Sequence, residues 1–265
     1  MSATTAATAT LELKGVSKSF GSVQALREVD FEVRDGEVMA LVGDNGAGKS
    51  TLIKCIAGIY AIDDGQILFE GKPVSIHGPK DAAKLGIEVV YQDLALCDNL
   101  DVVQNMYLGR EAHDALQRLQ EAVMEQKTSE TLRSLRVTTI RSIRQSVATL
   151  SGGQRQSVAV ARAVMWNSKV VILDEPTAAL GVAQTEQVLE LVARLAEQGL
   201  AVVLISHNLH DVFAVAHRIT VLRLGRNIAL YEREKTTQQE VVGAITAGVP
   251  TKVSGIASTQ PEEAS

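Results

Sequence analysis

The stretch Gly43-Asp44-Asn45-Gly46-Ala47-Gly48-Lys49-Ser50-Thr51 decides the fold of this 265-residue chain. It fits the pattern GxxxxGK[ST], in which glycines let the backbone fold closely around phosphate oxygens. The apolar run EVMALVG (37–43) leads into it and predicts a buried strand, and a helical pattern begins at Lys49. A helix N-terminus adds its positive dipole end, so we expect the whole stretch to bind nucleotide phosphates. Lys49 is expected to reach the β- and γ-phosphates, and the Ser50 hydroxyl to ligate Mg²⁺.

A second apolar strand delivers two carboxylates. It runs from Val170 to Leu173 and is followed by Asp174 and Glu175. Ligands of open α/β sheets bind at the carboxyl ends of the strands, where these side chains would lie. We therefore expect Asp174 to hold Mg²⁺ directly or through water, and Glu175 to polarise an attacking water as the general base.

A third motif is LSGGQ (150–154), followed by RQSVAVARA (155–163). Ser151 is a good N-cap for the helix that follows, and Gly152 and Gly153 leave N–H groups free to meet an anion. With this motif the chain resembles the ATP-binding cassette family over roughly residues 11 to 230. The resemblance implies ATP and Mg²⁺ as cofactors, an ATPase activity, and a signature segment that closes over the γ-phosphate bound by a partner subunit. Ser151, Gly152, Gly153 and Gln154 would then serve a second copy of the chain in a head-to-tail dimer.

The resemblance also assigns three isolated residues. Phe20, in VSKSFG, matches the aromatic residue that stacks on adenine. Gln92, in VVYQD, matches the glutamine that senses Mg²⁺ and the γ-phosphate, and His207, in VVLISHN, matches the switch histidine that contacts the γ-phosphate. One departure is Gly181, which stands where the family usually has the aspartate of SALD. Coupling between the two ATP sites is therefore in question.

The sequence predicts an α/β fold with three parts. The motifs imply a P-loop (RecA-like) core with a mostly parallel sheet, built from strands at KVVILDEP, AVVLISH and HRITVLRLG around a helix at GVAQTEQVLELVARLAEQG. An antiparallel β subdomain is expected in the first lobe, where EVDFEVR alternates and QILFEGKPV suggests a strand pair. Helix formers such as DALQRLQEAVMEQKTSETLRSLR predict a helical subdomain at about 94–164, inserted in a cassette domain of residues 11–250. Residues 1–10 and 251–265 are expected to be disordered tails.

Composition excludes several classes of function. The 26 Lys and Arg against 31 Asp and Glu give a formal charge of -5, which argues against nucleic acid as a partner. Two cysteines outside any CxxC spacing argue against a disulfide framework or a zinc site. No apolar run is long enough to cross a membrane, so we expect a peripheral protein on the cytoplasmic face of the inner membrane, with a separate permease.

Within the family, two stretches resemble ATPases of bacterial monosaccharide importers. They are residues 77–111 and EPTAALGVAQT (175–185), the second being most similar to a single-cassette, fructose-import branch. This resemblance implies permease subunits and, indirectly, a periplasmic sugar-binding protein as partners. Fructose, ribose, xylose and a polyol remain open as substrates. The alternative is a soluble cassette ATPase without a permease, such as one that assists iron-sulphur cluster assembly.

Overall fold

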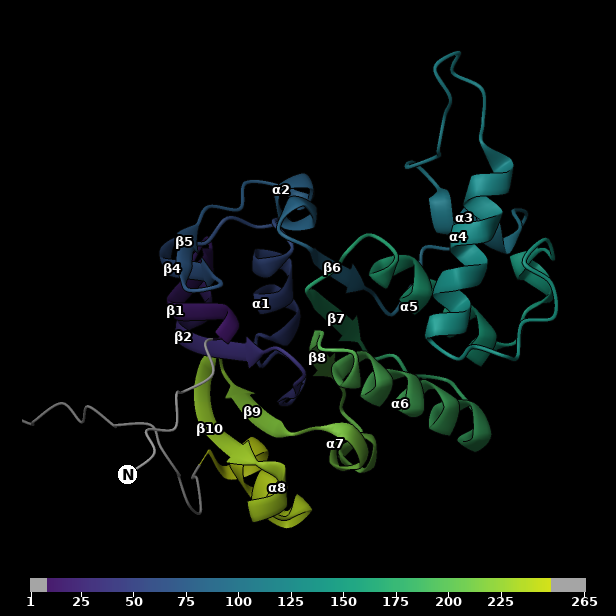
Figure 1. Cartoon of the computed structure of the whole chain (residues 1–265). Coiled ribbons are helices and arrows are strands. Elements are labelled where there is room, and N and C mark those ends of the chain that lie inside the picture. The colour runs from purple at the N-terminus through teal and green to yellow at the C-terminus, as the bar shows by residue number, and fades with distance from the viewer. Residues whose placement is uncertain (1–8, 249–265) are drawn as a thin grey trace, which may run out of the picture.

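The computed structural model describes residues 9–248, and its core is a six-stranded sheet (Figure 1). The strand order is β10-β9-β3-β8-β7-β6, and every neighbouring pair is parallel except β9 with β10. The bounds are β3 Val38–Val42, β6 Ile87–Val90, β7 Val170–Asp174, β8 Ala201–Ile205, β9 Arg218–Arg223 and β10 Arg226–Glu232. The predicted α/β class with a mostly parallel sheet is confirmed.

Both faces of this sheet are buried, because the apolar strands alternate between two hydrophobic layers. Met39 and Leu41 of β3 pack in one core cluster, whereas Ala40 and Val42 pack in another. The helices around the sheet are α1 Lys49–Ile56, α2 Pro79–Lys84, α6 Val182–Glu197, α7 Leu209–Val215 and α8 Gln238–Ala247, with a short 3-10 turn η2 at Arg233–Lys235. Parallel strands covered in this way place all their carboxyl ends at one edge, where the motifs lie.

An antiparallel sheet of order β2-β1-β4-β5 forms the second part of the molecule. Its strands are β1 Ala9–Phe20, β2 Val23–Arg34, β4 Asp64–Phe69 and β5 Lys72–Val74. Strand β1 begins at Ala9, two residues before the expected start of the cassette at residue 11. The Thr10 hydroxyl donates to Asp35, and the Thr10 carbonyl accepts from the Glu70 amide, so Thr10 is held from both sides.

The predicted helical insertion forms a helical lobe of α3 Val102–Tyr107, α4 Glu121–Ser134, the 3-10 turn η1 Val147–Thr149 and α5 Gly152–Val164 (Figure 1). Its apolar residues share one core cluster with β7 and β8 of the sheet. Helix α4 begins at Glu121, later than the helix-forming composition from Asp114 suggests. The Asp114 carboxylate accepts from the amides of Leu116 and Arg118, and Gln117 has φ +60°. An aspartate that binds nearby amides in this way competes with helix formation. Residues between α3 and α4 therefore form a projecting hairpin.

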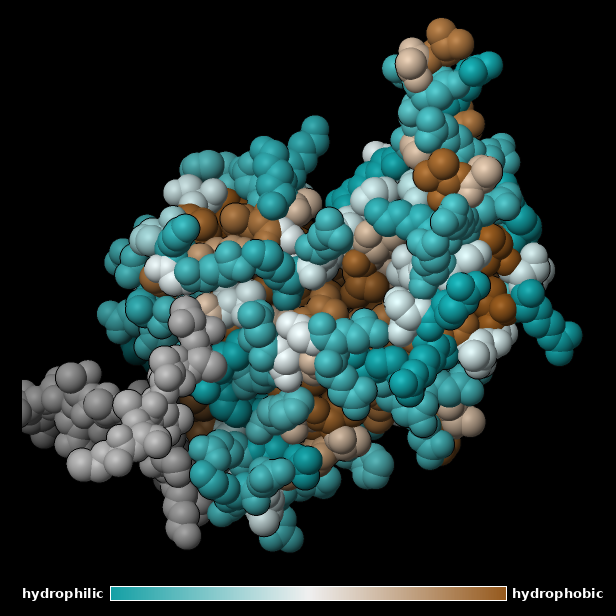
Figure 2. All heavy atoms as spheres, viewed as in Figure 1, coloured by the Kyte–Doolittle hydropathy of each residue, from teal (hydrophilic) through white to brown (hydrophobic). Residues whose placement is uncertain are grey.

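Figure 2 shows a mostly hydrophilic surface, with hydrophobic residues in the hollow between the two lobes. No helix within residues 9–248 is long and apolar enough to cross a membrane. The tails expected to be disordered lie, apart from Ala9 and Thr10, outside the described residues, as do the last two residues of the expected 11–250 cassette.

Candidate functional site

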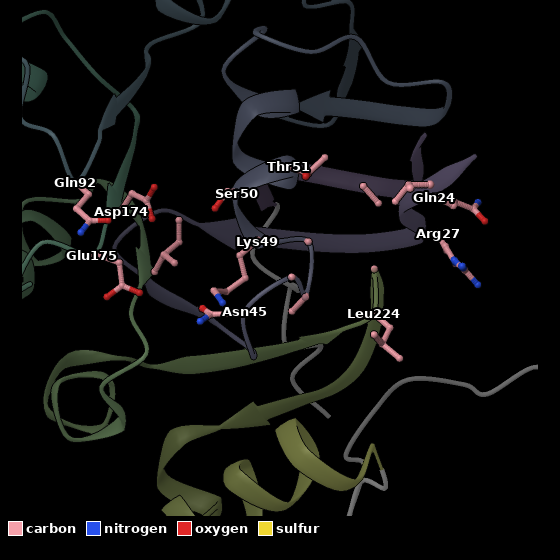
Figure 3. Close-up of a pocket in the computed structure, with 17 residues that line it drawn as sticks. Gln24, Arg27, Asn45, Lys49, Ser50, Thr51, Gln92, Asp174, Glu175 and Leu224 are labelled. Carbon is pink, nitrogen blue, oxygen red and sulfur yellow. The ribbon is translucent and has the colours of Figure 1, made fainter. Parts of the chain in front are cut away.

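The phosphate loop lines a pocket of about 510 Å³ at the carboxyl edge of the parallel sheet (Figure 3). The pocket brings together side chains from three of the predicted motifs, with Gln92, Asp174 and Glu175 beside the loop. The loop residues that line it are Asn45, Gly46, Ala47, Gly48, Lys49, Ser50 and Thr51. Gly43 and Asp44, also predicted to bind phosphate, form the start of the loop and are not among the described residues that line the pocket.

Two glycines are required by the path of this loop. Gly48 has φ +107°, and a Cβ there would lie 2.9 Å from the Ala25 carbonyl oxygen. Gly43 has φ +154°, and a Cβ would come within 2.3 Å of the Leu222 carbonyl oxygen. Any side chain at either position would displace a neighbouring backbone segment, so the loop can keep this curve only with glycine.

Lys49 bridges the two ends of the loop. Its Nζ donates to the carbonyl oxygens of Gly43 at 2.7 Å and Asp44 at 3.1 Å. Burial lowers the pKa of Lys49, and the nearby carboxylates of Glu175, Asp44 and Asp174 oppose that shift. A partly desolvated ammonium at this point is poised to exchange loop carbonyls for phosphate oxygens.

The two carboxylates lie where β7 ends. Burial raises the pKa of Asp174, Glu175 raises it further, and Lys49 and Lys54 act in the opposite direction. Glu175 has φ +51°, the left-handed region that a residue with a side chain rarely adopts. Its amide donates to the Ile205 carbonyl at 2.9 Å, which ties the strained residue to the end of β8. Strain of this kind concentrates at functional sites.

His207 and Glu175 come together. His207 Nδ1 lies 2.8 Å from Glu175 Oε2, although the His207 side chain is 74% exposed. His207 is not among the described residues that line the pocket. It lies next to the pocket because it contacts Glu175, which does line it. Gln92 follows β6 and is exposed within the pocket, next to Asp174 in the close-up (Figure 3).

The LSGGQ segment begins α5, away from this pocket. Ser151 is the N-cap of a capping box, in which its hydroxyl accepts from the Gln154 amide and its own amide donates to the Gln154 side chain. Gly152 packs so closely that an added Cβ would lie 2.8 Å from Leu180 Cδ2. None of residues 151–154 is part of the described lining of the phosphate pocket.

Phe20 also stands outside the described pocket lining. Phe20 is 42% exposed, and its ring meets the Tyr60 ring edge-on, with centroids 5.0 Å apart. The pocket wall instead includes residues that sequence reasoning missed, from the start of β2 and the β9–β10 turn (Figure 3). These residues are Val23, Gln24, Ala25, Arg27, Leu224 and Gly225. They belong to no motif, and only the folded chain brings them to the loop.

Comparison with known proteins agrees with this geometry. The family model described as "ABC transporter" matches residues 26–178. The chain is 47% identical to the fructose import ATP-binding protein FrcA of Rhizobium meliloti, over 89% of this chain and 93% of that protein. It is 46% identical to the xylose/arabinose import ATP-binding protein XylG of Sulfolobus acidocaldarius, over 89% and 94%. The ribose import ATP-binding protein RbsA of Yersinia pestis is 41% identical, but only 45% of that protein is covered.

Solved structures show the same fold. MJ1267, an ATP-binding cassette of an ABC transporter, superposes in its ADP conformation with a TM-score of 0.77 at 26% identity, over 90% of this chain and 95% of that one. The dimeric structure of MJ0796, a bacterial ABC transporter cassette, gives a TM-score of 0.70 at 25% identity, over 84% and 98%. With its phosphate loop, paired carboxylates and LSGGQ helix in one cassette fold, the chain belongs to the ABC transporter family and is an ATP-binding ATPase.

Proposed function

We propose that the chain is the ATP-hydrolysing subunit of an importer for a monosaccharide. The observation that supports ATP hydrolysis is that one and the same pocket is lined by the phosphate loop and by Gln92, Asp174 and Glu175. The names of the relatives support the transport part, because FrcA, XylG and RbsA are all import ATP-binding proteins for sugars. They favour this function over that of a cytosolic cassette ATPase for iron-sulphur cluster assembly.

The loop from Gly43 to Thr51 binds the ATP phosphates through its inward N–H groups and the N-terminus of α1. Lys49 leaves the Gly43 and Asp44 carbonyls and binds the β- and γ-phosphates. The Phe20 ring, exposed at the end of β1, offers a face for stacking on adenine. The wall residues Val23 and Leu224 add apolar surface beside the loop.

The pocket also suits Mg²⁺. Ser50, Gln92 and Asp174 supply hydroxyl, amide and carboxylate oxygens there, which are the hard donors that this ion prefers. No group of three or more His, Cys, Asp or Glu within residues 9–248 could hold a metal by itself. A site with few protein ligands fits an ion that takes its remaining ligands from water and phosphate. When bound, Mg²⁺ would neutralise charge on the β- and γ-phosphates.

In the hydrolysis of ATP to ADP and phosphate, Glu175 is the general base. Its carboxylate orients a water molecule in line with the γ-phosphate and accepts the proton as the new P–O bond forms and the bond to ADP breaks. His207, within hydrogen-bond distance of Glu175, fixes that carboxylate and contacts the γ-phosphate. Gln92, two residues beyond the end of β6, would contact a bound Mg²⁺ and the γ-phosphate, and so would register whether the site is loaded.

The LSGGQ segment completes the site of a second copy. Residues 151–154 lie outside the described lining of their own pocket, and the N-terminus of α5 presents N–H groups to an anion from elsewhere. In a head-to-tail dimer each ATP contacts Lys49 of one copy and the signature of the other. Two permease subunits would anchor the pair to the cytoplasmic face of the inner membrane, and a periplasmic sugar-binding protein would deliver substrate.

Purification of the tagged protein from detergent-solubilised membranes of the cells that produce it tests the transport function. We expect a complex with a multi-span protein. Vesicles that contain this complex, with MgATP inside and the sugar-binding protein outside, should take up one of fructose, ribose, xylose or a polyol, and should fail to do so without MgATP. Glu175→Gln serves as the matched control, since it should assemble and fail to transport. A chain that hydrolyses ATP but never associates with a membrane protein would contradict the importer and leave the ATPase assignment intact.

A further inference from the structure

The buried carboxylate of Asp211 contacts two residues that lie close in sequence to Glu175 and His207. Asp211, in the first turn of α7, is 3% exposed. Its two oxygens have different partners: the Thr177 hydroxyl donates to Oδ2 at 2.6 Å, and the Asn208 side-chain amide donates to Oδ1 at 3.0 Å. His210 Nδ1, at 3.9 Å from Oδ1, is at the limit of an ion pair and is largely exposed.

These partners come from the two turns that carry the catalytic pair. Thr177 is two residues beyond Glu175, and Asn208 directly follows His207. The turns leave neighbouring parallel strands, β7 and β8. Thr177, Asn208 and Asp211 are absent from the described lining of the nucleotide pocket, so Asp211 is placed to act on the pair from outside it.

Burial makes this contact an effective constraint on geometry. A carboxylate removed from water is costly unless hydrogen bonds satisfy it, and here each oxygen is satisfied only when its own turn is in place. Separation of the two turns would strand one oxygen without a donor. The His207 side chain, in contrast, is mostly solvent-exposed and gains little from packing.

We propose that Asp211 is a positioning residue for ATP hydrolysis. Through Thr177 and Asn208 it ties the turn that carries Glu175 to the turn that carries His207, and thereby sets the distance between Glu175 Oε2 and His207 Nδ1. The inference rests on the proposed roles of Glu175 and His207. Because a base displaced by a fraction of an ångström loses its alignment with the attacking water, the link should affect turnover more than nucleotide affinity.

Thr177 is the sharpest probe of this link. Asp211→Ala would leave two donors unpaired and endanger the fold, whereas Thr177→Val removes one donor at nearly constant shape. We expect Thr177→Val to lower the kcat for MgATP by about tenfold or more, with the Kd for ATP within about twofold of the parent. Thr177→Ser keeps the hydroxyl and should restore most of the turnover. All assays use the full chain, well below the melting temperature of each variant.

A double-mutant cycle with His207→Ala distinguishes the possible outcomes. If Asp211 acts through the pair, Thr177→Val should have little further effect on kcat in a His207→Ala background. An undiminished effect there, or a Thr177→Val variant with lowered melting temperature and parent kcat, would overturn the positioning role. If His207→Ala alone left kcat unchanged, the proposed role of His207 would fail instead. The single variants Thr177→Val and His207→Ala therefore show whether the positioning role of Asp211 or the proposed role of His207 has failed.

Discussion

His207 Nδ1 lies 2.8 Å from Glu175 Oε2, and the backbone of Glu175 has a φ of +51°. The two side chains extend from the ends of the neighbouring strands β8 and β7. Glu175 lines the pocket beside the phosphate loop, and His207 contacts it from outside the described lining. Binding of ATP and its hydrolysis can therefore be disturbed separately, at different residues.

The first prediction separates these two steps. Lys49→Ala should abolish nucleotide binding, because the ammonium that meets the β- and γ-phosphates is lost. Glu175→Gln should bind ATP as the parent does and lose roughly 10²- to 10⁴-fold in rate, since an amide cannot accept the proton. Equilibrium binding of nucleotide and steady-state phosphate release measure the two effects. Turnover by Glu175→Gln at the parent rate would exclude Glu175 as the base.

The second prediction concerns pH. Burial raises the folded-state pKa of Asp174 above its unfolded value, so below the unfolded pKa the carboxyl group is neutral in both states and carries no penalty. As the pH rises from the unfolded pKa to the folded pKa, the unfolded state ionises more readily than the folded state, so folding stability falls, and above the folded pKa the loss is constant. Asp174→Asn should therefore raise the melting temperature of the nucleotide-free protein, by an amount that grows across this pH interval and then levels off.

Melting curves from roughly pH 4 to pH 8 check this dependence on Asp174. The exposed Asp93 provides the matched control, and Asp93→Asn should show no such trend. The same Asp174→Asn variant should lose the Mg²⁺ dependence of ATP binding. A destabilisation by Asp174→Asn that is equal at every pH would contradict the electrostatic penalty.

The third prediction tests the shared site. Ser151 caps α5, and aspartate and asparagine are equally good caps, so Ser151→Asp and Ser151→Asn should both fold. Only the aspartate brings a negative charge toward the γ-phosphate of the partner. We expect Ser151→Asp to lose most activity and Ser151→Asn to keep much of it. A substitution at Gly152 would not isolate the effect of charge, because an added Cβ would also clash with Leu180.

Mixing Ser151→Asp with Lys49→Ala should restore activity. In a mixed dimer both lesions fall in one composite site and the other site stays intact, so random pairing gives at most roughly a quarter of the parent activity on symmetry grounds. Strong cooperativity would lower this figure. Tagged mixed dimers that also carry Glu175→Gln should then trap one ATP each. Isolated mixed dimers without turnover and without trapped ATP would rule out a shared site.

The fourth prediction concerns the interface loop at Gly181. Gly181 is the N-cap of α6 with φ −75°, and no described atom lies within 4 Å of a Cβ built there. Gly181→Asp and Gly181→Asn should therefore both be accommodated and stabilise the fold by a few tenths of a kcal/mol, on the order of a better cap. If the missing carboxylate matters for coupling, only the aspartate should change the Hill coefficient of ATPase activity, at constant nucleotide Kd. If the parent and both variants form dimers and show the same Hill coefficient, Gly181 plays no part in the coupling between the two ATP sites.

The sequence predicts most of this site because the motifs are local. The loop from Gly43 to Thr51 is marked by one continuous stretch of sequence between its own strand and helix, and Asp174 follows directly from the strand that carries it. The sequence does not predict the turn at Asp114, because the residues around it are also good helix formers. The hydrogen bonds from the amides of Leu116 and Arg118 to the Asp114 carboxylate favour the turn over a helix.

Contacts over long sequence distance could not be predicted in the same way. Thr177 and Asp211 are 34 residues apart, and a threonine and an aspartate with no motif between them carry no signal of pairing. Leu224 reaches the pocket only because the β9–β10 hairpin turns back over the phosphate loop. Such neighbours depend on strand order, which single motifs do not specify.

The bonds from Lys49 to the Gly43 and Asp44 carbonyls have a thermodynamic consequence. The ammonium of Lys49 bridges the loop, so an arriving nucleotide exchanges the hydrogen bonds of Lys49 instead of adding to them. The contribution of Lys49 to affinity is then set by the difference between phosphate and carbonyl oxygens as acceptors, which is largest for a multiply charged polyphosphate. Singly charged anions, abundant in any cell, gain little from the exchange. The loop thus discriminates by charge before any contact with the base or the sugar of the nucleotide is made.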